Sequence, residues 1–403
     1  IVGLFAQNSF AVDLASVFEL AQGHDPSFQA AIAEKDANKA EAIKSRLAYL
    51  PSAKYTQTRS EYDTAGARKT ITVSQPLFDP VKGATFLQGG ARSDFADSSF
   101  LTKQHDLAQR VLKAVNQIIL TTEAIETNQK RIEAFDSQYQ GAKRKFELGQ
   151  GTITDMRDIE VKFQQAKADH LTLKANKVIA EKQFMSITGQ QAPQTGFKLA
   201  NTPLPLKIDD LEVILQKVSA SNAQVLTARA NEKINKLESA KAIGSLSPSI
   251  YATNTRSEYG TVTSSYNGIA VSFPLEIGGF VGAYGSSAKS AQAINQRMDT
   301  EEKTKVEAER LYQLVMAGQE SVQIKKSAVE IAQLSVEANQ KSFQAGVRST
   351  TDVLNSIQVL FQVKNEYVQA VTQLSETALN LSLITAEDPS VSMKAIQVSL
   401  MAR

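Results

Sequence analysis

Two patterns of hydrophobic and polar residues alternate along this chain. The first is the three-four spacing of a coiled coil, which places apolar residues at most core positions of one very long helix from about residue 81 to 148. Those core positions are Val111, Ala114, Ile118, Thr121, Ile125, Asn128, Ile132, Phe135, Tyr139, Ala142 and Phe146. Because an α-helix rises about 1.5 Å per residue, such a helix extends over roughly 100 Å, which no single globular domain requires.

The second pattern is the two-residue alternation of a β-strand, which precedes the long helix. In residues 68–77, Ile71 and Val73 alternate with Thr and Ser, and residues 52–62 have a similar Thr- and Tyr-rich composition. With the polar turn between them, these segments predict a β-hairpin over residues 52–77. Its strands of roughly ten residues have the length at which a tilted strand crosses a bilayer, about 9–11 residues.

The second half of the chain repeats the first. Residues 58–62, Thr-Arg-Ser-Glu-Tyr, recur 197 positions later as residues 255–259. The core positions of a second long helix stand at the same offset, at Ala308, Leu311, Val315, Gly318, Val322, Lys325, Val329, Ala332, Val336, Asn339 and Phe343. A second hairpin is expected over residues 249–275, with a longer and more mobile turn at residues 260–267. Together these matches indicate two tandem copies of one structural unit.

Breaks in these patterns set the expected boundaries. Residues 1–11 are interpreted either as the remnant of an export signal or as an N-terminal tail. Repeat 1 spans residues 12–189 and comprises a helix to about residue 47, the hairpin at 52–77, the long helix at 81–148 and a helix at 152–188. After a Pro- and Gln-containing linker at 190–207, repeat 2 spans residues 208–386, with a first helix, the hairpin at 249–275, the long helix at 279–345 and a helix at 350–385. Residues 387–403 are expected to form a C-terminal tail.

Composition narrows the classes of function. The formal net charge is +2 and the chain has no Cys, so no electrostatic pull toward nucleic acid, no disulfide and no zinc-thiolate site is expected. The chain contains no run of 18 or more apolar residues, and therefore no transmembrane helix is predicted. His24, His105 and His170 are widely scattered, and His170 holds a core position, which favours packing over a metal site. No phosphate loop, nucleophile elbow or carboxylate pair is present, so neither an enzyme nor a cofactor is predicted.

The two predicted hairpins supply four strands, and this number has a consequence. Four strands cannot close a barrel, and an open sheet edge is not tolerated in lipid. If the hairpins are membrane strands, the chain must therefore assemble with other copies of itself. Two copies would supply eight strands and three would supply twelve.

The order of these elements resembles the TolC-like outer-membrane factor family over roughly residues 12–386. The segments at residues 149–155, Gly-Gln-Gly-Thr-Ile-Thr-Asp, and at residues 346–354, Gly-Val-Arg-Ser-Thr-Thr-Asp-Val-Leu, resemble the loop-to-helix segments of that family. The resemblance implies a mixed, mainly α membrane protein and a homotrimer. Its twelve-stranded β-barrel would lie in the lipid of the outer membrane and continue into a long α-helical coiled-coil barrel in the periplasm.

The resemblance also implies a function and partners. The trimer would be a channel-tunnel, the exit duct for type I protein secretion or tripartite efflux. It would work with a periplasmic adaptor protein and an inner-membrane ABC transporter or proton-driven pump. The alternative from another class is a soluble structural coiled-coil protein without channel activity, whose Thr-rich hairpins are adhesive.

The resemblance further implies a gate where the long helices end. By position, the polar network that holds the tunnel's periplasmic mouth shut falls on Asp155, Phe343 and Arg348. Phe343 stands where the family has Tyr, so one hydroxyl donor is missing. From the residues alone, an Asp at such a helix start is equally explained as a first-turn acid that interacts with the helix dipole.

An acidic ring at the tunnel entrance is the second feature that the resemblance implies. Its two positions fall on Asp352 and Asn355, and Asn355 departs from the Asp of the family. The ring would then hold three carboxylates in a trimer in place of six, and weaker cation binding is expected. Asp158, which matches Asn355 in repeat 1, would partly compensate.

Overall fold

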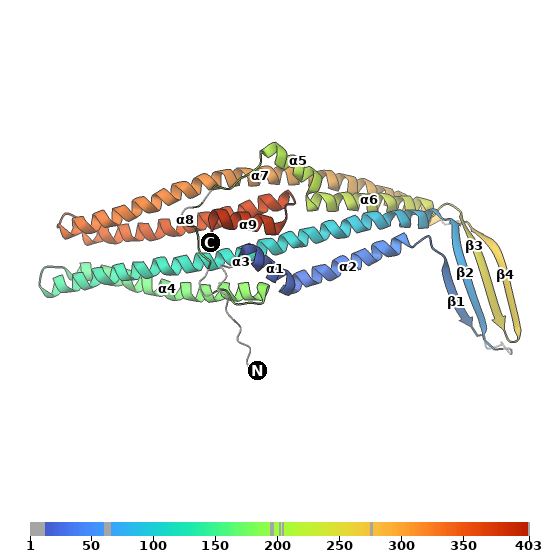
Figure 1. Cartoon of the computed structure of the whole chain (residues 1–403), viewed down its shortest axis with the longest axis horizontal. Coiled ribbons are helices and arrows are strands. Elements are labelled where there is room, and N and C mark those ends of the chain that lie inside the picture. The colour runs from blue at the N-terminus through green and yellow to red at the C-terminus, as the bar shows by residue number, and fades with distance from the viewer. Residues whose placement is uncertain are drawn as a thin grey trace. The chain divides into compact units, whose positions relative to one another are not determined.

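The computed structural model describes residues 13–59, 66–193, 197–200, 203, 205–274 and 277–401 (Figure 1). The prediction for residues 1–11 therefore lies outside the described residues, as does most of the first hairpin's turn. The chain divides into two compact units. The sheet unit comprises Ala31–Thr102 and Ser219–Lys305, and the helical unit comprises Ile1–Ala30, Lys103–Val218 and Val306–Arg403.

The sheet unit contains one antiparallel sheet in the order β1-β2-β3-β4. Its strands are β1 (Ser52–Thr58), β2 (Arg68–Phe78), β3 (Ser249–Tyr259) and β4 (Val262–Ser272). The central pairing, β2 with β3, joins repeat 1 to repeat 2, with Ile71 opposite Arg256. Within the described part of the chain, the outer strands β1 and β4 each pair on one side only, so each presents a free edge.

The second hairpin differs from the expected one. Its turn consists of two residues, Gly260 and Thr261, and not of residues 260–267, because β4 begins at Val262 and pairs with β3 as far as Tyr259. Gly260 has φ +58, as the first position of a two-residue type II′ turn requires. The prediction of a long, mobile turn was wrong because Ser, Thr and Asn in an exposed strand have the composition of a loop, whereas the ladder is made by the backbone.

A buried carboxylate holds the sheet to the start of the first long helix. Asp79 is 6% exposed and accepts the N–H of Lys82 at 3.0 Å, so it caps α3 (Pro80–Glu147). The Tyr251 hydroxyl, from β3, donates to its other oxygen. The Asp79 N–H in turn donates to the Tyr49 hydroxyl at 3.1 Å. Side chains from both repeats therefore fix the point where strand becomes helix.

Among the described residues, the other regular elements of both units are helices, apart from an isolated β-bridge between Leu199 and Met401 in the helical unit. They are α1 (Leu14–His24), α2 (Pro26–Arg46), α3, α4 (Ile153–Thr188), α5 (Leu211–Ser221), α6 (Ala223–Gly244), α7 (Ile277–Gln344), α8 (Thr350–Ile384) and α9 (Pro389–Leu400). The two long helices, α3 and α7, each have 68 residues and run from the sheet unit into the helical unit. The same order of elements in both halves confirms the mainly α fold with two tandem repeats.

The first helix of each repeat is broken at matching positions. Asp25 separates α1 from α2, and Asn222, 197 positions later, separates α5 from α6. Asp25 accepts the N–H of Phe28 at 2.7 Å, and Asn222 accepts the N–H of Val225 at 3.1 Å. Each side chain therefore caps the helix that follows it. Asp25 is followed by Pro26, a residue that favours the first position of a helix, whereas Asn222 is followed by Ala223.

The C-terminal segment is not the expected tail. Helix α9 begins at Pro389, and its capping residue, Asp388, accepts the N–H of Ser390 at 2.7 Å. Met393 and Leu400 are at most 1% exposed, and α9 packs against α1 and α8. The segment was misjudged because its apolar residues recur at helical spacing over only three turns, too short a pattern to stand out beside the long helices.

Candidate functional site

The long helices α3 and α7 end in the same kind of turn, and both turns lie at one end of the helical unit (Figure 1). Gly149 follows α3 with φ +68, and Gly346 follows α7 with φ +77. In repeat 1 the N–H of Gln150 donates to the Lys145 carbonyl at 2.8 Å, and in repeat 2 the N–H of Val347 donates to the Ser342 carbonyl at 2.9 Å. These are Schellman closures, which require a left-handed residue and therefore favour Gly. The helix pair α3–α4 is the repeat-1 hairpin and the helix pair α7–α8 is the repeat-2 hairpin; both are distinct from the β-hairpins of the sheet.

Both returning helices begin with a hydroxyl cap and an acid in the first turn. In repeat 1, the N–H of Asp155 donates to Thr152 Oγ1 at 3.1 Å, and the Thr152 hydroxyl donates to the Asp155 carboxylate at 2.7 Å. In repeat 2, Ser349 and Asp352 form a full capping box, because the N–H of Ser349 also donates to Asp352 at 3.1 Å. Asp155 and Asp352 are therefore used as first-turn acids, as one reading of the sequence predicted.

Asp352, which the sequence analysis places in the entrance ring, has a carboxyl group whose pKa is shifted by its neighbours. Hydrogen bonds from the backbone N–H and the hydroxyl of Ser349 lower the pKa of the Asp352 carboxyl below its ordinary value, and the charge of Arg348 lowers it further. The Arg348 guanidinium is 3.9 Å from the Asp352 carboxylate, and both side chains are at least 40% exposed. The negative charge of Asp352 is thus secured by its own cap more than by Arg348.

The structure of one protomer does not bring all the predicted latch residues together. Among the described residues, Arg348 forms its ion pair with Asp352, and Asp155 bonds to Thr152. No ion pair between Asp155 and Arg348 is found within the part of this one chain that the structure describes. The latch between Asp155 and Arg348 therefore stays a prediction.

Phe343 does contact the other repeat, through a residue that the sequence did not single out. The Lys145 ammonium, in the last turn of α3, lies 4.4 Å from the centre of the Phe343 ring, in the last turn of α7. A cation over an aromatic face is attracted by the negative face of the ring. Lys145 thus interacts with the residue that lacks the expected hydroxyl. The periodic pattern could not reveal it, because Lys145 is exposed and lies off the core positions.

The two remaining candidates lie on the surface. Asn355 and Asp158 are both exposed, one turn into α8 and α4. They occupy matching positions of the two hairpins.

A hydrophobic cluster joins the two hairpins away from their turns. It consists of Phe135, Ile159, Phe163, Ala166, Val336, Val353, Leu354 and Ile357, which come from all four helices. The ring of Tyr139 stacks on that of Phe163 at a centroid distance of 6.2 Å. The two hairpins are therefore packed against each other by apolar side chains, and the half-buried Phe343 packs against this cluster. Asp155 and Arg348 are exposed at the turns.

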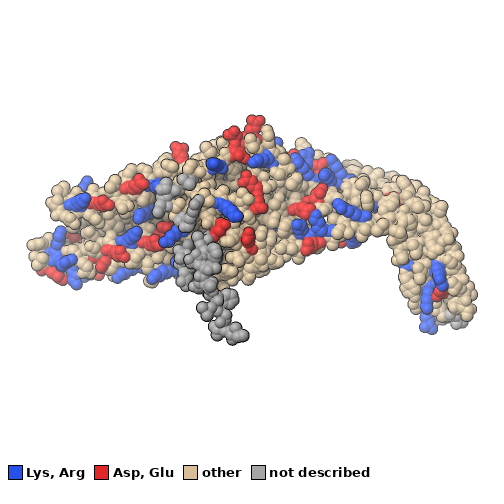
Figure 2. Space-filling model, viewed as in Figure 1, with Lys and Arg blue, Asp and Glu red and all other residues tan. Residues whose placement is uncertain are grey.

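The sheet has a different surface. No residue of β4 is charged, and the apolar side chains Tyr266, Ile269 and Val271 are at least 59% exposed. The apolar exposure continues at the start of α7, where Phe280 is 66% and Tyr284 is 79% exposed. Figure 2 shows few charged residues on the face of the sheet in view, most of them toward the far end of the strands. Because successive side chains of a strand face opposite sides, Ile269 and Val271 lie on one face of the sheet and Tyr266 lies on the other. Exposed apolar side chains on an uncharged strand favour contact with lipid or with another protein.

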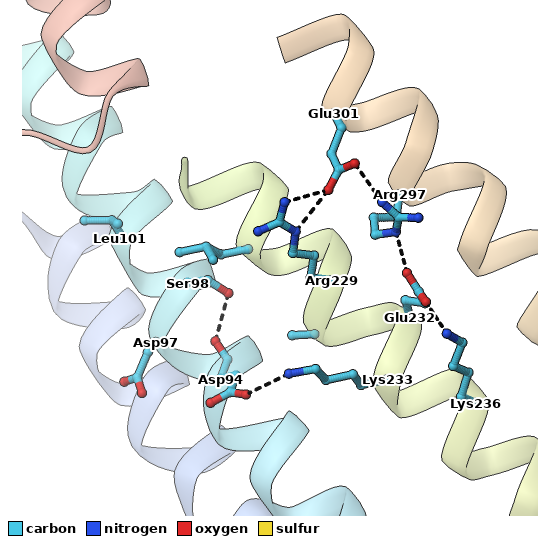
Figure 3. A pocket seen from close by; sticks show the side chains of 12 residues that line it. Asp94, Asp97, Ser98, Leu101, Arg229, Glu232, Lys233, Lys236, Arg297 and Glu301 are labelled. Atoms are coloured by element: carbon cyan, nitrogen blue, oxygen red, sulfur yellow. Dashed lines mark hydrogen bonds and ion pairs between the residues drawn. The ribbon is translucent and has the colours of Figure 1, made fainter. Parts of the chain in front are cut away.

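A cavity of about 840 Å³ in the sheet unit is lined by residues of α3, α6 and α7. Figure 3 shows a chain of ion pairs in its wall, from Arg229 through Glu301 and Arg297 to Glu232. Arg229 is 2.9 Å and Arg297 is 2.7 Å from the Glu301 carboxylate. These charges neutralise one another, so the cavity wall carries no surplus charge to hold an ion.

No group of three or more His, Cys, Asp and Glu that could hold a metal ion occurs among the described residues. None of the helices in the described part of the chain is long and apolar enough to span a membrane.

Comparison with known proteins identifies the class to which this fold belongs. A family model described as "Outer membrane efflux protein" matches residues 17–190 and 209–387, one match for each repeat. The chain therefore belongs to the outer membrane efflux protein family, whose members are outer-membrane channels and not enzymes. This confirms the predicted resemblance, the outer-membrane location and the function as an outer-membrane duct for secretion or efflux.

Particular relatives cover nearly the whole chain. The alkaline protease secretion protein AprF of Pseudomonas aeruginosa is 26% identical over 408 residues, which cover 91% of this chain and 83% of AprF. The outer membrane protein TolC of Vibrio cholerae is 24% identical over 429 residues, 98% of this chain and 96% of TolC. The crystal structure of the outer membrane protein VceC from Vibrio cholerae superimposes with a TM-score of 0.74 at 16% identity, over 94% of this chain and 96% of VceC.

Proposed function

We propose that three copies of this chain form one twelve-stranded β-barrel in the outer membrane, continued by an α-helical barrel in the periplasm. The single observation that carries the proposal is the four-stranded sheet whose outer strands, β1 and β4, both have free edges. Unpaired backbone groups are costly in lipid, so β4 of one copy must pair with β1 of the next. Strand β4 has no charged residue and exposes Ile269 and Val271, which supports a position in the membrane.

The cargo of this duct is proposed to be protein, delivered by an inner-membrane ABC transporter through a periplasmic adaptor. Support comes from AprF, which by its name serves the secretion of an alkaline protease. Tripartite efflux of small molecules, driven by a proton-driven pump, is the second candidate, favoured by the description of the family itself. Co-expression with an ABC transporter, an adaptor and a protein substrate distinguishes the two: extracellular substrate supports secretion, and drug resistance without secretion supports efflux.

The turns of the two hairpins are proposed to form the gate of the trimer. Asp155 of one protomer would pair with Arg348 of its neighbour, beside Phe343. Asp352, Asn355 and Asp158 would form the entrance ring. Both Arg348 and Asp155 are exposed in one protomer, so they are accessible to a neighbour. Such charge-assisted pairs are individually worth only about 1.5–3 kcal/mol, so a docked adaptor can break them.

Single-channel conductance of the purified trimer in planar bilayers tests both the channel and the gate. Arg348→Ala and Asp155→Ala are expected to raise the conductance, because either substitution removes one partner of the latch. Arg157→Ala is a matched control, because Arg157 is an exposed base in the same turn of α4 and pairs with Glu160. Unchanged conductance in both latch variants would contradict the gate, and absence of any conductance would contradict the channel.

The entrance ring is tested in the same bilayers. Asn355→Asp adds a carboxylate to each protomer and is expected to strengthen block of the channel by divalent cations. Block that is equal in wild type and variant would contradict the assignment of Asn355 to the ring.

A further inference from the structure

Arg131 is a charged residue in an unusual place. It lies in α3, 6% exposed, and it is the one buried base among the residues that the structure describes. Its position is between two core positions of the coiled coil, Asn128 and Ile132, and close in sequence to Phe135 of the hydrophobic cluster. Burial of a charge is costly unless the charge is well paired, so its presence asks for an explanation.

The guanidinium of Arg131 is held by side chains from three helices. Its Nη1 donates to the Asp169 carboxylate, on α4, at 3.0 Å. Its carbon Cζ lies 4.7 Å from the ring centre of Phe361, on α8, and 5.5 Å from that of Phe135. Arg131 therefore connects the repeat-1 hairpin to the repeat-2 hairpin by a contact between Arg131 and Phe361.

The pairing of this buried charge is incomplete. Asp169 is 54% exposed, so the single carboxylate partner lies partly in water. A further contact, from Nη1 to Asn128 Oδ1, is long at 3.4 Å, and Nε has no hydrogen-bond partner among the described residues. Asn128 is itself bound elsewhere, since its amide donates to the Ala166 carbonyl at 2.8 Å. The guanidinium thus gains from the Phe361 ring but would also gain from water.

The contact from Arg131 of repeat 1 to Phe361 of repeat 2 has no equivalent from repeat 2 to repeat 1. The position 197 residues after Arg131 is Ala328, and the position 197 residues before Phe361 is Gln164. The repeat therefore does not require an Arg at this site of the coiled coil. Replacing a buried ion pair with apolar side chains of similar volume is often neutral or stabilising, so packing alone does not require it either.

We propose that Arg131 sets the equilibrium between the packed and the separated arrangement of the two hairpins. This inference rests on the proposed gate, in which the hairpins must move against each other. While α8 is packed on α3, the Phe361 ring covers the guanidinium. When α8 moves away, Arg131 loses the ring and gains water, and this hydration offsets part of the cost of opening the hydrophobic cluster. Arg131 is thus a positioning residue that keeps the inter-hairpin contact reversible.

Two substitutions at this one contact are expected to act in opposite directions. Arg131→Met keeps an unbranched apolar chain against Phe361 but cannot be hydrated, so it favours the packed arrangement. In the Arg348→Ala background it is expected to lower the channel's open probability by about threefold or more, because the loss of the hydration that Arg131 gains on opening outweighs the loss of one cation–π contact. Phe361→Leu keeps apolar volume but removes the ring, so it is expected to raise the open probability by a similar factor.

The experiment is single-channel recording of the trimer in planar bilayers, with thermal unfolding measured on the same samples. Lys130→Met and Val359→Leu are matched controls, because Lys130 and Val359 are exposed neighbours on α3 and α8. Neither control is expected to change the open probability. Arg131→Lys, which retains the charge but has a more strongly hydrated head, is expected to lie on the more open side of wild type.

The outcomes separate this inference from the proposed gate. Opposite shifts for Arg131→Met and Phe361→Leu support it, whether or not Arg348→Ala alone changes the conductance. If Arg348→Ala opens the channel but both variants leave the open probability unchanged, the gate stands and the role of Arg131 is overturned. If both variants shift it in the same direction, in proportion to their unfolding temperatures, the residue is merely structural and the inference is again overturned.

Discussion

The two repeats have the same order of helices and strands, but the side chain that caps the helix after the first break differs between them. At the break of the first helix, repeat 1 has Asp25, which is 4% exposed and receives two hydrogen bonds from Arg110 at 2.7 and 3.0 Å. Repeat 2 has the neutral amide of Asn222 at the matching position. The residue that matches Arg110 is Glu307, which pairs with Arg310 of its own helix.

This difference shows which interaction is required to start the helix after the break. Both side chains cap the following helix through the same oxygen position, so an oxygen acceptor is sufficient to start α2 or α6. The ion pair of repeat 1 adds a separate connection, from the α1–α2 break to α3. Repeat 1 is therefore more dependent on a long-range contact than repeat 2.

The largest expected effect comes from breaking that ion pair. Arg110→Met leaves the Asp25 carboxylate buried without its cation, which for a buried pair costs about 3–5 kcal/mol. The midpoint of thermal unfolding of the purified protein in detergent should fall clearly. Glu307→Met, the same change at the matching position of repeat 2, should cost less than about 1 kcal/mol, because the Glu307–Arg310 pair is exposed. Equal effects of the two substitutions would refute the asymmetry between the repeats.

A smaller effect on the stability of the folded protein is expected when the pH is lowered. The hydrogen bonds from the Arg110 side chain, followed by that from the N–H of Phe28, lower the pKa of Asp25 below its ordinary value of 3.8, although burial opposes them. Because the pKa is lower in the folded state, the ion pair contributes stability above about pH 4, and this contribution is lost as the pH falls through the folded-state pKa.

Asp25→Asn, which gives repeat 1 the residue of repeat 2, provides the comparison for this pH dependence. The variant should unfold at a lower temperature than wild type at pH 7. The difference between the two unfolding temperatures should become smaller below about pH 4. Thermal unfolding followed by circular dichroism from pH 7 to pH 3 measures it. A gap that stays constant over this range would show that the charge of Asp25 contributes nothing.

The smallest effects are expected where the repeats agree. Gly149→Ala and Gly346→Ala should each cost about 1–2 kcal/mol, because both residues have positive φ, at +68 and +77. Gly141→Ala is the control, since Gly141 lies inside α3 with no atom within 4 Å of an added Cβ, and repeat 2 already has Ala338 there. That control should stabilise by about 0.5–1 kcal/mol. Hydrogen exchange of the backbone amides in the α3–α4 and α7–α8 turns measures the loss of local stability in the two Gly variants. Clearly unequal losses would contradict the equivalence of the two turns.

Much of the fold could be predicted from local sequence patterns. The long helices α3 and α7 were expected within two residues of their observed ends, because a core pattern sustained over many turns admits only one period. The turns at Gly149 and Gly346 were also expected, because a Gly after an apolar periodic segment ends a helix. Asp155 and Asp352 could be placed at helix starts for the same local reason.

The candidate site was predictable only in part. Position along the chain identified Phe343, Arg348 and Asp352, but not that Lys145 covers the Phe343 ring or that Ser349 holds Asp352 in a capping box. Arg131 gave no signal at all, because an Arg beside a core position is normally an exposed side chain. Its burial depends on Phe361, which is 230 positions away in the sequence.

By itself the sequence determined the duplication, the long helices, the turns that end them and the presence of two β-hairpins. These features depend on interactions within a few residues, such as backbone hydrogen bonds, capping and the period of the apolar positions. Only the tertiary structure decided where β4 begins, that α9 packs on α1 and α8, and that Asp25 meets Arg110. Such pairs form when distant helices and strands pack side by side, and a repeating pattern shows which face of an element is buried but not which residue lies opposite it.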